Sequence, residues 1–201
     1  MENMPFFIYP ILGYILGSVP SALWITRIFK GIDVRDGGSG HVTTTNTIRQ
    51  AGWGAGIIVL ILDIAKGFLP AFFAYHSGNP DWVVALTAAL VIVGHCWPIF
   101  AQFRGGMGLA VTGGCFLAVS PISFPIALAI LVFLVLIIKH SARAAFFTGL
   151  LITPVLLIAG QRGTIIWVSI AAGLVIAIRF TIDWNRKYRE VWLDREGKAS
   201  G

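Results

Sequence analysis

The feature that most constrains the fold of this chain is a succession of seven apolar runs separated by short polar segments. These runs cover approximately 6–28, 53–75, 82–100, 109–120, 122–138, 144–160 and 163–179. A helix that crosses a bilayer needs roughly 20 apolar residues, and backbone inside lipid must satisfy its own hydrogen bonds. We therefore expect an all-α polytopic membrane protein that forms one integral-membrane domain over residues 1–201, with a single short span at 109–120.

Composition excludes the other broad classes. The chain is 57% hydrophobic and 12% charged, with a mean hydropathy of +0.83, which is far from a soluble domain. Its first residues carry no basic region or cleavage site, so we expect no removable signal peptide. The net charge of +6 is not gathered in a soluble basic domain, which argues against a nucleic-acid partner and for contact with membrane lipid. Cys96 and Cys115 lack metal-ligand spacing, so no metal site is expected.

The basic residues predict the orientation. With seven crossings and the amino terminus outside, nearly all of them fall on the inner side. These are Arg27, Lys30, Arg35, Arg49, Arg104, Lys139, Arg143, Arg179, Arg186, Lys187, Arg189, Arg195 and Lys198. If 109–120 did not cross, the first loop and the tail would lie on opposite sides, against the positive-inside preference. We therefore predict seven transmembrane helices, one of them short, with the N-terminus outside and the C-terminus inside.

Two glycine-rich polar segments interrupt the apolar pattern. Residues 37–46 read Gly-Gly-Ser-Gly-His-Val-Thr-Thr-Thr-Asn, and 94–108 begin with Gly-His and end with Gly-Gly-Met-Gly. Glycine lets backbone N–H groups approach a ligand closely, and such groups beside a helix start bind anions. The predicted topology brings both segments, the turn at 139–143 and the start of the tail to one membrane face. This convergence favours a phosphate site. Taken alone, the first segment is equally compatible with a ligand cradle and with an ordinary turn followed by a threonine cap.

Ionisable residues inside the apolar runs are a second functional signal. Asp63 and Lys66 lie three residues apart on one helix face, about 15 Å into the second run at 1.5 Å per residue. An ionisable pair inside a membrane segment is costly, so we hypothesise that it has a functional role. The alternative is a purely structural salt bridge that joins helices. His95, near the inner end of the third run, is either a packing residue or part of a site. Because no nucleophile–base motif is present, chemistry here would depend on positioning and charge stabilisation.

Read together, these segments resemble the bacterial acyl-phosphate:glycerol-3-phosphate acyltransferases. The family loops read approximately Gly-Ser-Gly-Asn-x-Gly-x-Thr-Asn-x-x-Arg, Asp-x-x-Lys-Gly and Gly-His-x-x-Pro-x-Phe-x-x-Phe-Lys-Gly-Gly-Lys-Gly. The matching residues are Gly38, Ser39, Gly40, Thr45, Asn46, Arg49, Asp63, Lys66, Gly67, Gly94, His95, Pro98, Phe100, Phe103, Gly105, Gly106 and Gly108. An early Gly17-Ser18-x-Pro20 also fits, and the resemblance covers nearly the whole chain.

The resemblance implies an enzyme that moves a fatty acyl group from acyl phosphate to the 1-hydroxyl of glycerol 3-phosphate. The product would be lysophosphatidic acid, made at the cytoplasmic face of the bacterial inner membrane without a cofactor and in reach of other lipid-synthesis enzymes. It implies catalytic or positioning roles for His95, Lys66 and Asn46. The substrate-binding residues it implies are Ser39, Gly40, Thr45, Arg49, Arg104 and Arg143.

Several motif positions depart from the family pattern. His41 stands in place of asparagine, Thr43 in place of glycine, and Met107 in place of the lysine of Gly-Gly-Lys-Gly. The family pattern Arg-His-Arg-x-Asn reads Arg-Phe-Thr-Ile-Asp at 179–183. We hypothesise that the acyl-phosphate side of the site is better retained than the acceptor side. Two alternatives remain: a relative that binds acyl phosphate without this transfer, and a small transporter of a phosphorylated solute, which the lack of an inverted repeat disfavours.

Overall fold

The structure is a computed structural model that describes residues 6–185, and within this range it contains helices and no strand. The predicted inner-side cations Arg186, Lys187, Arg189, Arg195 and Lys198 lie outside the described residues. The α-helices are α1 (Ile8–Gly17), α2 (Ser21–Lys30), α3 (Thr44–Ala51), α4 (Trp53–His76), α5 (Asp81–Cys96), α6 (Leu109–Val119), α7 (Ser123–Ile138), α8 (Ser141–Ile158) and α9 (Thr164–Ile182). Two short 3-10 helices, Val34–Asp36 and Ile99–Ala101, lie in the loops.

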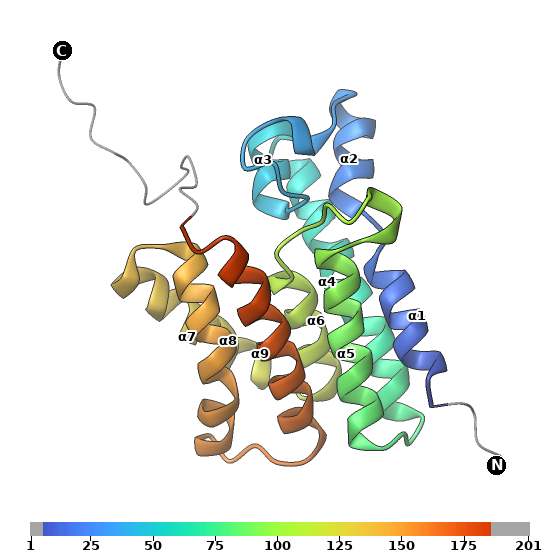
Figure 1. The fold of residues 1–201 in the computed structure, drawn as a ribbon, viewed down its shortest axis with the longest axis vertical. Helices are drawn as coiled ribbons and strands as arrows, with labels where there is room; N and C mark the ends of the chain where they lie inside the picture. Colours follow the sequence, from blue (N-terminus) through green and yellow to red (C-terminus); the bar gives the residue numbers. More distant parts are fainter. Residues whose placement is uncertain (1–5, 186–201) are drawn as a thin grey trace.

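The apolar segments alternate in direction between the two ends of a helical bundle (Figure 1). At one end, the Tyr9 hydroxyl donates to Ser77 at 2.7 Å, and Ser120 donates to Gln161 at 2.9 Å. The Ser120 bond places the far end of α6 beside the turn between α8 and α9, so even this 11-residue helix runs toward that end. The opposite end, which we call the loop end, carries residues 31–52, 97–108, 139–140 and the C-terminal end of α9.

The helices are apolar enough for a membrane but unequal in length. Five segments have both the length and the composition to cross: Ile8–Lys30, Trp53–His76, Asp81–Ala101, Ser141–Ile158 and Thr164–Ile182. The other two apolar helices, α6 and α7, are shorter, and α6 rises only about 16 Å at 1.5 Å per residue. The expected short run at 109–120 is therefore short in the structure too.

The first apolar run, expected to be continuous over 6–28, is broken between α1 and α2. Proline lacks a backbone N–H and cannot continue the hydrogen-bond ladder, and Pro20 sits at the start of α2. The chain instead turns through Val19, whose N–H donates to the Leu16 carbonyl at 3.2 Å. The break leaves the Val19 carbonyl turned toward α4, where it accepts a side-chain hydrogen bond.

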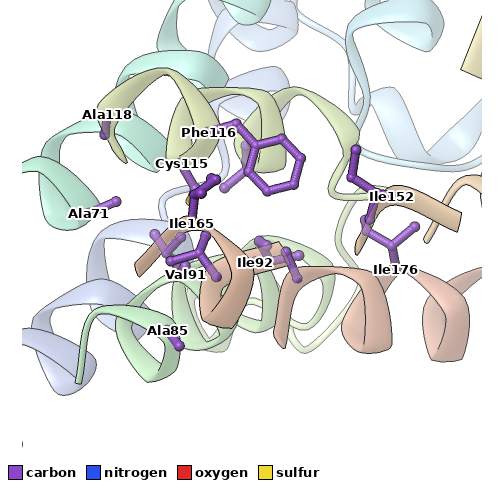
Figure 2. Close-up of a cluster of buried hydrophobic side chains, with 14 of the residues drawn as sticks. Ala71, Ala85, Val91, Ile92, Cys115, Phe116, Ala118, Ile152, Ile165 and Ile176 are labelled. Atoms are coloured by element: carbon purple, nitrogen blue, oxygen red, sulfur yellow. The ribbon is translucent and has the colours of Figure 1, made fainter. Parts of the chain in front are cut away.

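The bundle is held by one large buried apolar cluster that joins α4, α5, α6, α8 and α9. Figure 2 shows part of it, with Phe116 of α6, Ile152 of α8 and Ile176 of α9. Close backbone approach makes α4 and α6 neighbours: a Cβ at Gly114 would overlap the Ile64 carbonyl, and one at Gly67 the Val111 carbonyl. Small residues of this kind are how membrane helices pack tightly. They fix α6 against α4 beside the loop end.

Candidate active site

The first glycine-rich segment is wound around the side chain of Asn46. Its Nδ2 donates to the carbonyls of Val34 (2.8 Å), His41 (3.0 Å) and Gly37 (3.2 Å). Its Oδ1 accepts the backbone N–H of Ser39 at 3.1 Å. Asn46 is fully buried and its amide is fully engaged, so it holds the loop in shape from within.

Thr43 caps the helix that follows this loop. Its backbone is extended, and its hydroxyl accepts the Asn46 N–H at 3.3 Å at the start of α3. The capping interpretation of the threonine run is therefore correct for Thr43. It does not exclude a ligand role, because Thr43, Thr44 and Thr45 also line the large cavity described below.

The second glycine-rich segment packs directly on His95. The Gly106 N–H donates to the His95 carbonyl at 3.0 Å, and a Cβ at Gly106 would overlap the His95 ring. The Gly105 carbonyl accepts the Val42 N–H at 3.3 Å, so the two glycine-rich segments are hydrogen-bonded to each other. Their predicted convergence at one end of the bundle is confirmed.

Beneath these loops lies a buried cluster of polar side chains. Lys66 Nζ is 2.9 Å from Asp63 Oδ1 and donates to the Val19 carbonyl at 2.9 Å. The Ser21 hydroxyl donates to the same Asp63 oxygen at 2.9 Å. His95 Nδ1 lies 3.8 Å from Asp63 Oδ1. The salt bridge considered for Asp63 and Lys66 thus exists, and it also supports a carboxylate next to an active-site histidine candidate.

A cavity of about 840 Å³ opens beside this cluster, and most of its polar lining lies toward the loop end. Its polar lining consists of Ser39, His41, Thr43, Thr44, Thr45, Arg49, Asp63, His95, Thr112, Lys139, Ser141 and Thr148. Its apolar lining continues down α4, α6, α7, α8 and α9 and includes Leu60, Phe116, Phe124, Leu131, Ile152 and Ile176. Such a cavity suits an amphiphile with a polar head and a long apolar tail.

Arg49, which lines this cavity together with the second cation Lys139, has no acceptor among residues 6–185. Within residues 6–185 its Nε is buried without a hydrogen-bond partner, and no carboxylate lies within ion-pair distance of its guanidinium. Leaving a buried charged donor unsatisfied is costly, so this group is placed to meet an anion.

The structure brings together some of the predicted site residues and separates others. Ser39, Thr45, Arg49 and His95 line the cavity, and Lys66 lies directly behind Asp63. Gly40, with φ +70°, lines a separate shallow hollow of about 170 Å³ with Ser39.

Besides Lys66 and Gly40, three more predicted residues do not line the cavity. Asn46 lies inside the loop, and Arg104 is exposed at the surface. The Arg143 guanidinium lies 5.4 Å from the ring centroid of Trp184. The motif pattern alone did not indicate the direction of these side chains.

Sequence reasoning missed other parts of the site. Asp63 was not predicted as a site residue, yet it lines the cavity as well as forming a salt bridge, and Lys139 and Ser141 were not singled out as site residues. The roles of Ser21 and of the Val19 carbonyl were not predicted either. The one available signal for them was Pro20, because a proline in an apolar run frees a backbone carbonyl that a buried lysine can use.

A salt-bridged turn supports the first loop. Arg35 donates to both carboxylate oxygens of Asp33, at 2.7 and 3.0 Å, and its Nη1 donates to the Ala101 carbonyl at 3.2 Å. The Arg35 hydrogen bonds lower the pKa of Asp33 from 3.8 to about 2. This turn therefore ties the loop to the segment after α5.

No group of three or more metal-ligating side chains occurs in residues 6–185.

Comparison with known proteins gives the same fold and family. A model of the glycerol-3-phosphate acyltransferase family matches residues 7–189. The chain is 36% identical over 181 residues to the glycerol-3-phosphate acyltransferase of Listeria welshimeri, covering 88% of this chain and 87% of that protein. It is 38% identical over 184 residues to glycerol-3-phosphate acyltransferase 1 of Dehalococcoides mccartyi, with 88% of each covered.

Solved structures are similar over the same range. The crystal structure of PlsY, an integral membrane glycerol 3-phosphate acyltransferase, in its glycerol 3-phosphate form, matches with a TM-score of 0.76 and 32% identity over 90% of both chains. Its lysophosphatidic acid form matches with a TM-score of 0.75 and 30% identity, again over 90% of both. The chain is an all-helical integral membrane protein of bacterial type. It belongs to the glycerol-3-phosphate acyltransferase family.

Proposed function

We propose that this protein transfers a fatty acyl group from acyl phosphate to the 1-hydroxyl of glycerol 3-phosphate and releases lysophosphatidic acid and phosphate. The observation that carries the proposal is the cavity, which joins an unpaired guanidinium at the loop end to a long apolar channel. An acyl phosphate has an anionic head and an apolar chain, which matches both parts. Membership of the family supports the same activity.

The donor phosphate fits the loop end. There Arg49 supplies a permanent positive charge, and the hydroxyls of Ser39, Thr44 and Thr45 supply neutral donors. The acyl chain then extends between α6 and α7, where the lining is apolar. This arrangement holds the mixed anhydride with its carbonyl carbon near His95.

The buried polar cluster suits the transfer step. The acceptor oxygen bonds to the acyl carbon, the bond from that carbon to the phosphate oxygen breaks, and phosphate leaves with the bonding electrons. His95 is placed to accept the hydroxyl proton, and Asp63 stabilises the imidazolium that forms. Lys66 and Ser21 hold Asp63 in place. Phosphate is a good leaving group, so alignment supplies much of the rate.

An altered substrate specificity has support on the acceptor side of the active site. Met107 and Phe180 line the cavity, and neither can bind a phosphate group. Lys139, at the turn between α7 and α8, is the other permanent cation of the lining besides Arg49. We therefore place the acceptor phosphate toward Lys139, and keep an acceptor other than glycerol 3-phosphate as the second candidate. No direct substrate contact is assigned to Asn46, Gly40, Arg104 or Arg143.

We further propose that all seven apolar segments cross the bacterial cytoplasmic membrane and that the loop end faces the cytoplasm. The five long segments and the alternating directions support seven crossings, with α6 sheltered by α4 and α9. The cations Arg27, Lys30, Arg35, Arg49, Arg104, Lys139, Arg143 and Arg179 lie at or near the loop end, as the positive-inside preference requires of a cytoplasmic face. The amino terminus would then be outside.

The test is a transfer assay on purified protein in lipid. Palmitoyl phosphate and labelled glycerol 3-phosphate should give labelled lysophosphatidic acid, and palmitoyl-CoA should not replace the donor. Product with glycerol but none with glycerol 3-phosphate would favour the second candidate. Accumulation of labelled solute in sealed vesicles, with no ester formed, would contradict transfer altogether.

A further inference from the structure

Three buried ionisable side chains meet where the first glycine-rich loop contacts α9. His41 Nε2 lies 2.8 Å from Asp183 Oδ2, and Arg179 Nη1 lies 3.3 Å from the same oxygen. Arg179 Nη2 is 3.5 Å from His41 Nε2. Each of the three side chains is less than 10% exposed. The shortest distance assigns the His41 Nε2 proton to Asp183, with the carboxylate shared between the two basic groups.

This trio connects the parts of the site that are far apart in sequence. Arg179 Nε donates to the Gly106 carbonyl at 3.0 Å, and its guanidinium lies 5.9 Å from the ring centroid of Trp97. His41 belongs to the loop that carries Ser39 and lines the cavity itself. The first glycine-rich loop is therefore held in position by the end of α9 as well as by Asn46.

The trio coincides with two departures from the family pattern. Positions 41 and 183 carry asparagine in that pattern, and here they carry a histidine and an aspartate that bind each other. The two changes are not equivalent. Without His41, Asp183 keeps its pair with Arg179. Without the Asp183 charge, both His41 Nε2 and the buried Arg179 guanidinium lose the carboxylate that they share, and removing one partner of a buried ion pair is strongly destabilising.

We propose that Asp183 and Arg179 are positioning residues that act through His41 to hold the first glycine-rich loop in its phosphate-binding shape. On this account, His41 and Asp183 form one functional unit that sets the affinity for the phosphorylated donor. The inference rests on the proposed function only in the identity of that donor. It predicts strong coupling between two positions 142 residues apart, with unequal effects of the two single substitutions.

The test is a double-mutant cycle of His41→Asn and Asp183→Asn in the full-length protein. The readouts are the Kd for palmitoyl phosphonate, which cannot be hydrolysed, together with KM and kcat for palmitoyl phosphate. We expect Asp183→Asn to raise the Kd about tenfold, His41→Asn about threefold, and the double variant to return to within about threefold of wild type. The KM should follow the Kd, while kcat changes less than KM.

The matched control is Asp81→Asn, a carboxylate at the opposite end of the bundle that accepts the Thr164 hydroxyl. It should leave the Kd unchanged. Thermal unfolding in detergent separates a folding defect from a positioning defect, because the rescue in Kd should occur at closely similar midpoints. Additive effects of the two substitutions, or a Kd that none of them moves, would overturn the inference. Phosphonate binding with this coupling but no turnover would overturn the proposed transfer and leave the inference standing.

Discussion

Lys66 donates from Nζ to the Val19 carbonyl at 2.9 Å, across the break that Pro20 makes between α1 and α2. A proline in a transmembrane segment thus provides an acceptor for a lysine on the neighbouring helix. The same ammonium lies 2.9 Å from Asp63, and the carboxylate of Asp63 lies beside His95. Direct contacts therefore connect the backbone break at Pro20 with the Asp63–Lys66 salt bridge and with His95.

Removal of Lys66 should therefore destabilise the protein. Lys66→Met leaves the Asp63 carboxylate buried without its ammonium partner, although the Ser21 hydroxyl and His95 stay close, and breaking a buried pair costs about 3–5 kcal/mol. We expect a clearly lower unfolding midpoint in detergent, with Lys30→Met, an exposed lysine, as control. The double variant Asp63→Asn/Lys66→Met should recover the midpoint but transfer acyl groups about 100-fold more slowly, because His95 loses its carboxylate. Full activity of the double variant would contradict the assigned role of Asp63.

Arg49 should matter much more than Arg104. Loss of a charged hydrogen bond to substrate phosphate costs about 1.5–3 kcal/mol, so Arg49→Ala should raise the KM for acyl phosphate about 10- to 100-fold. Arg104→Ala removes an exposed side chain outside the cavity and should stay within about twofold of wild type. The reverse order in steady-state kinetics would show that the phosphate-binding arginine lies outside the cavity.

A lysine at position 107 tests the location of the acceptor. Met107 is buried, 9% exposed, and lines the cavity. Met107→Lys should lower the KM for glycerol 3-phosphate several-fold if the acceptor phosphate reaches this wall, with Met107→Leu as a volume-matched control. An unchanged KM is the result that our placement of the acceptor phosphate toward Lys139 predicts, and a lower KM would contradict that placement.

Phe124 should limit the length of the acyl chain. It lines the cavity near the start of α7, remote from the loop end, and a Cβ on Gly113 would lie 2.7 Å from its ring. Phe124→Ala should raise kcat/KM about tenfold for donors two carbons longer than the wild-type optimum, at about 0.8 kcal/mol per buried methylene. Phe133→Ala, an exposed position of the same helix, is the control. An unchanged chain-length profile would mean that the acyl chain takes another path.

Acid should weaken the first loop through Asp33. Its pKa is lowered from 3.8 to about 2 in the folded protein, so the unfolded chain binds the proton first as pH falls. The stabilisation is then present above about pH 4 and is lost as pH falls toward 2. The difference in unfolding midpoint between wild type and Asp33→Asn should be largest at pH 5 and shrink toward pH 2.5. A difference that stays constant over this range would contradict the ion pair with Arg35.

Periodic and compositional signals predicted the general architecture well. Apolar length located the apolar segments, including the short α6, but not the break between α1 and α2. The convergence of the two glycine-rich segments followed from the alternation of direction. The sequence around a motif residue could not predict the direction in which its side chain points. Asn46 points into its own loop, because a buried amide with three backbone acceptors is more stable there than in an open cavity.

Contacts between residues that are distant in sequence could not be predicted either. His41 and Asp183 looked like two separate losses of motif residues, because nothing local connects positions so far apart. Only the packing of α9 against the loop end reveals that they bind each other. The same holds for Val19 and Lys66, where the proline was visible but its partner on α4 was not.

The most direct measurement is an experimental structure of the protein in lipid with palmitoyl phosphonate. Our account predicts phosphonate oxygens within hydrogen-bond distance of Arg49 and the threonine run, and an acyl chain that passes Leu131 toward Phe124. Phosphonate bound at Arg104 or Arg143, with the cavity between α6 and α7 empty, would contradict the central claim that this cavity holds the acyl donor.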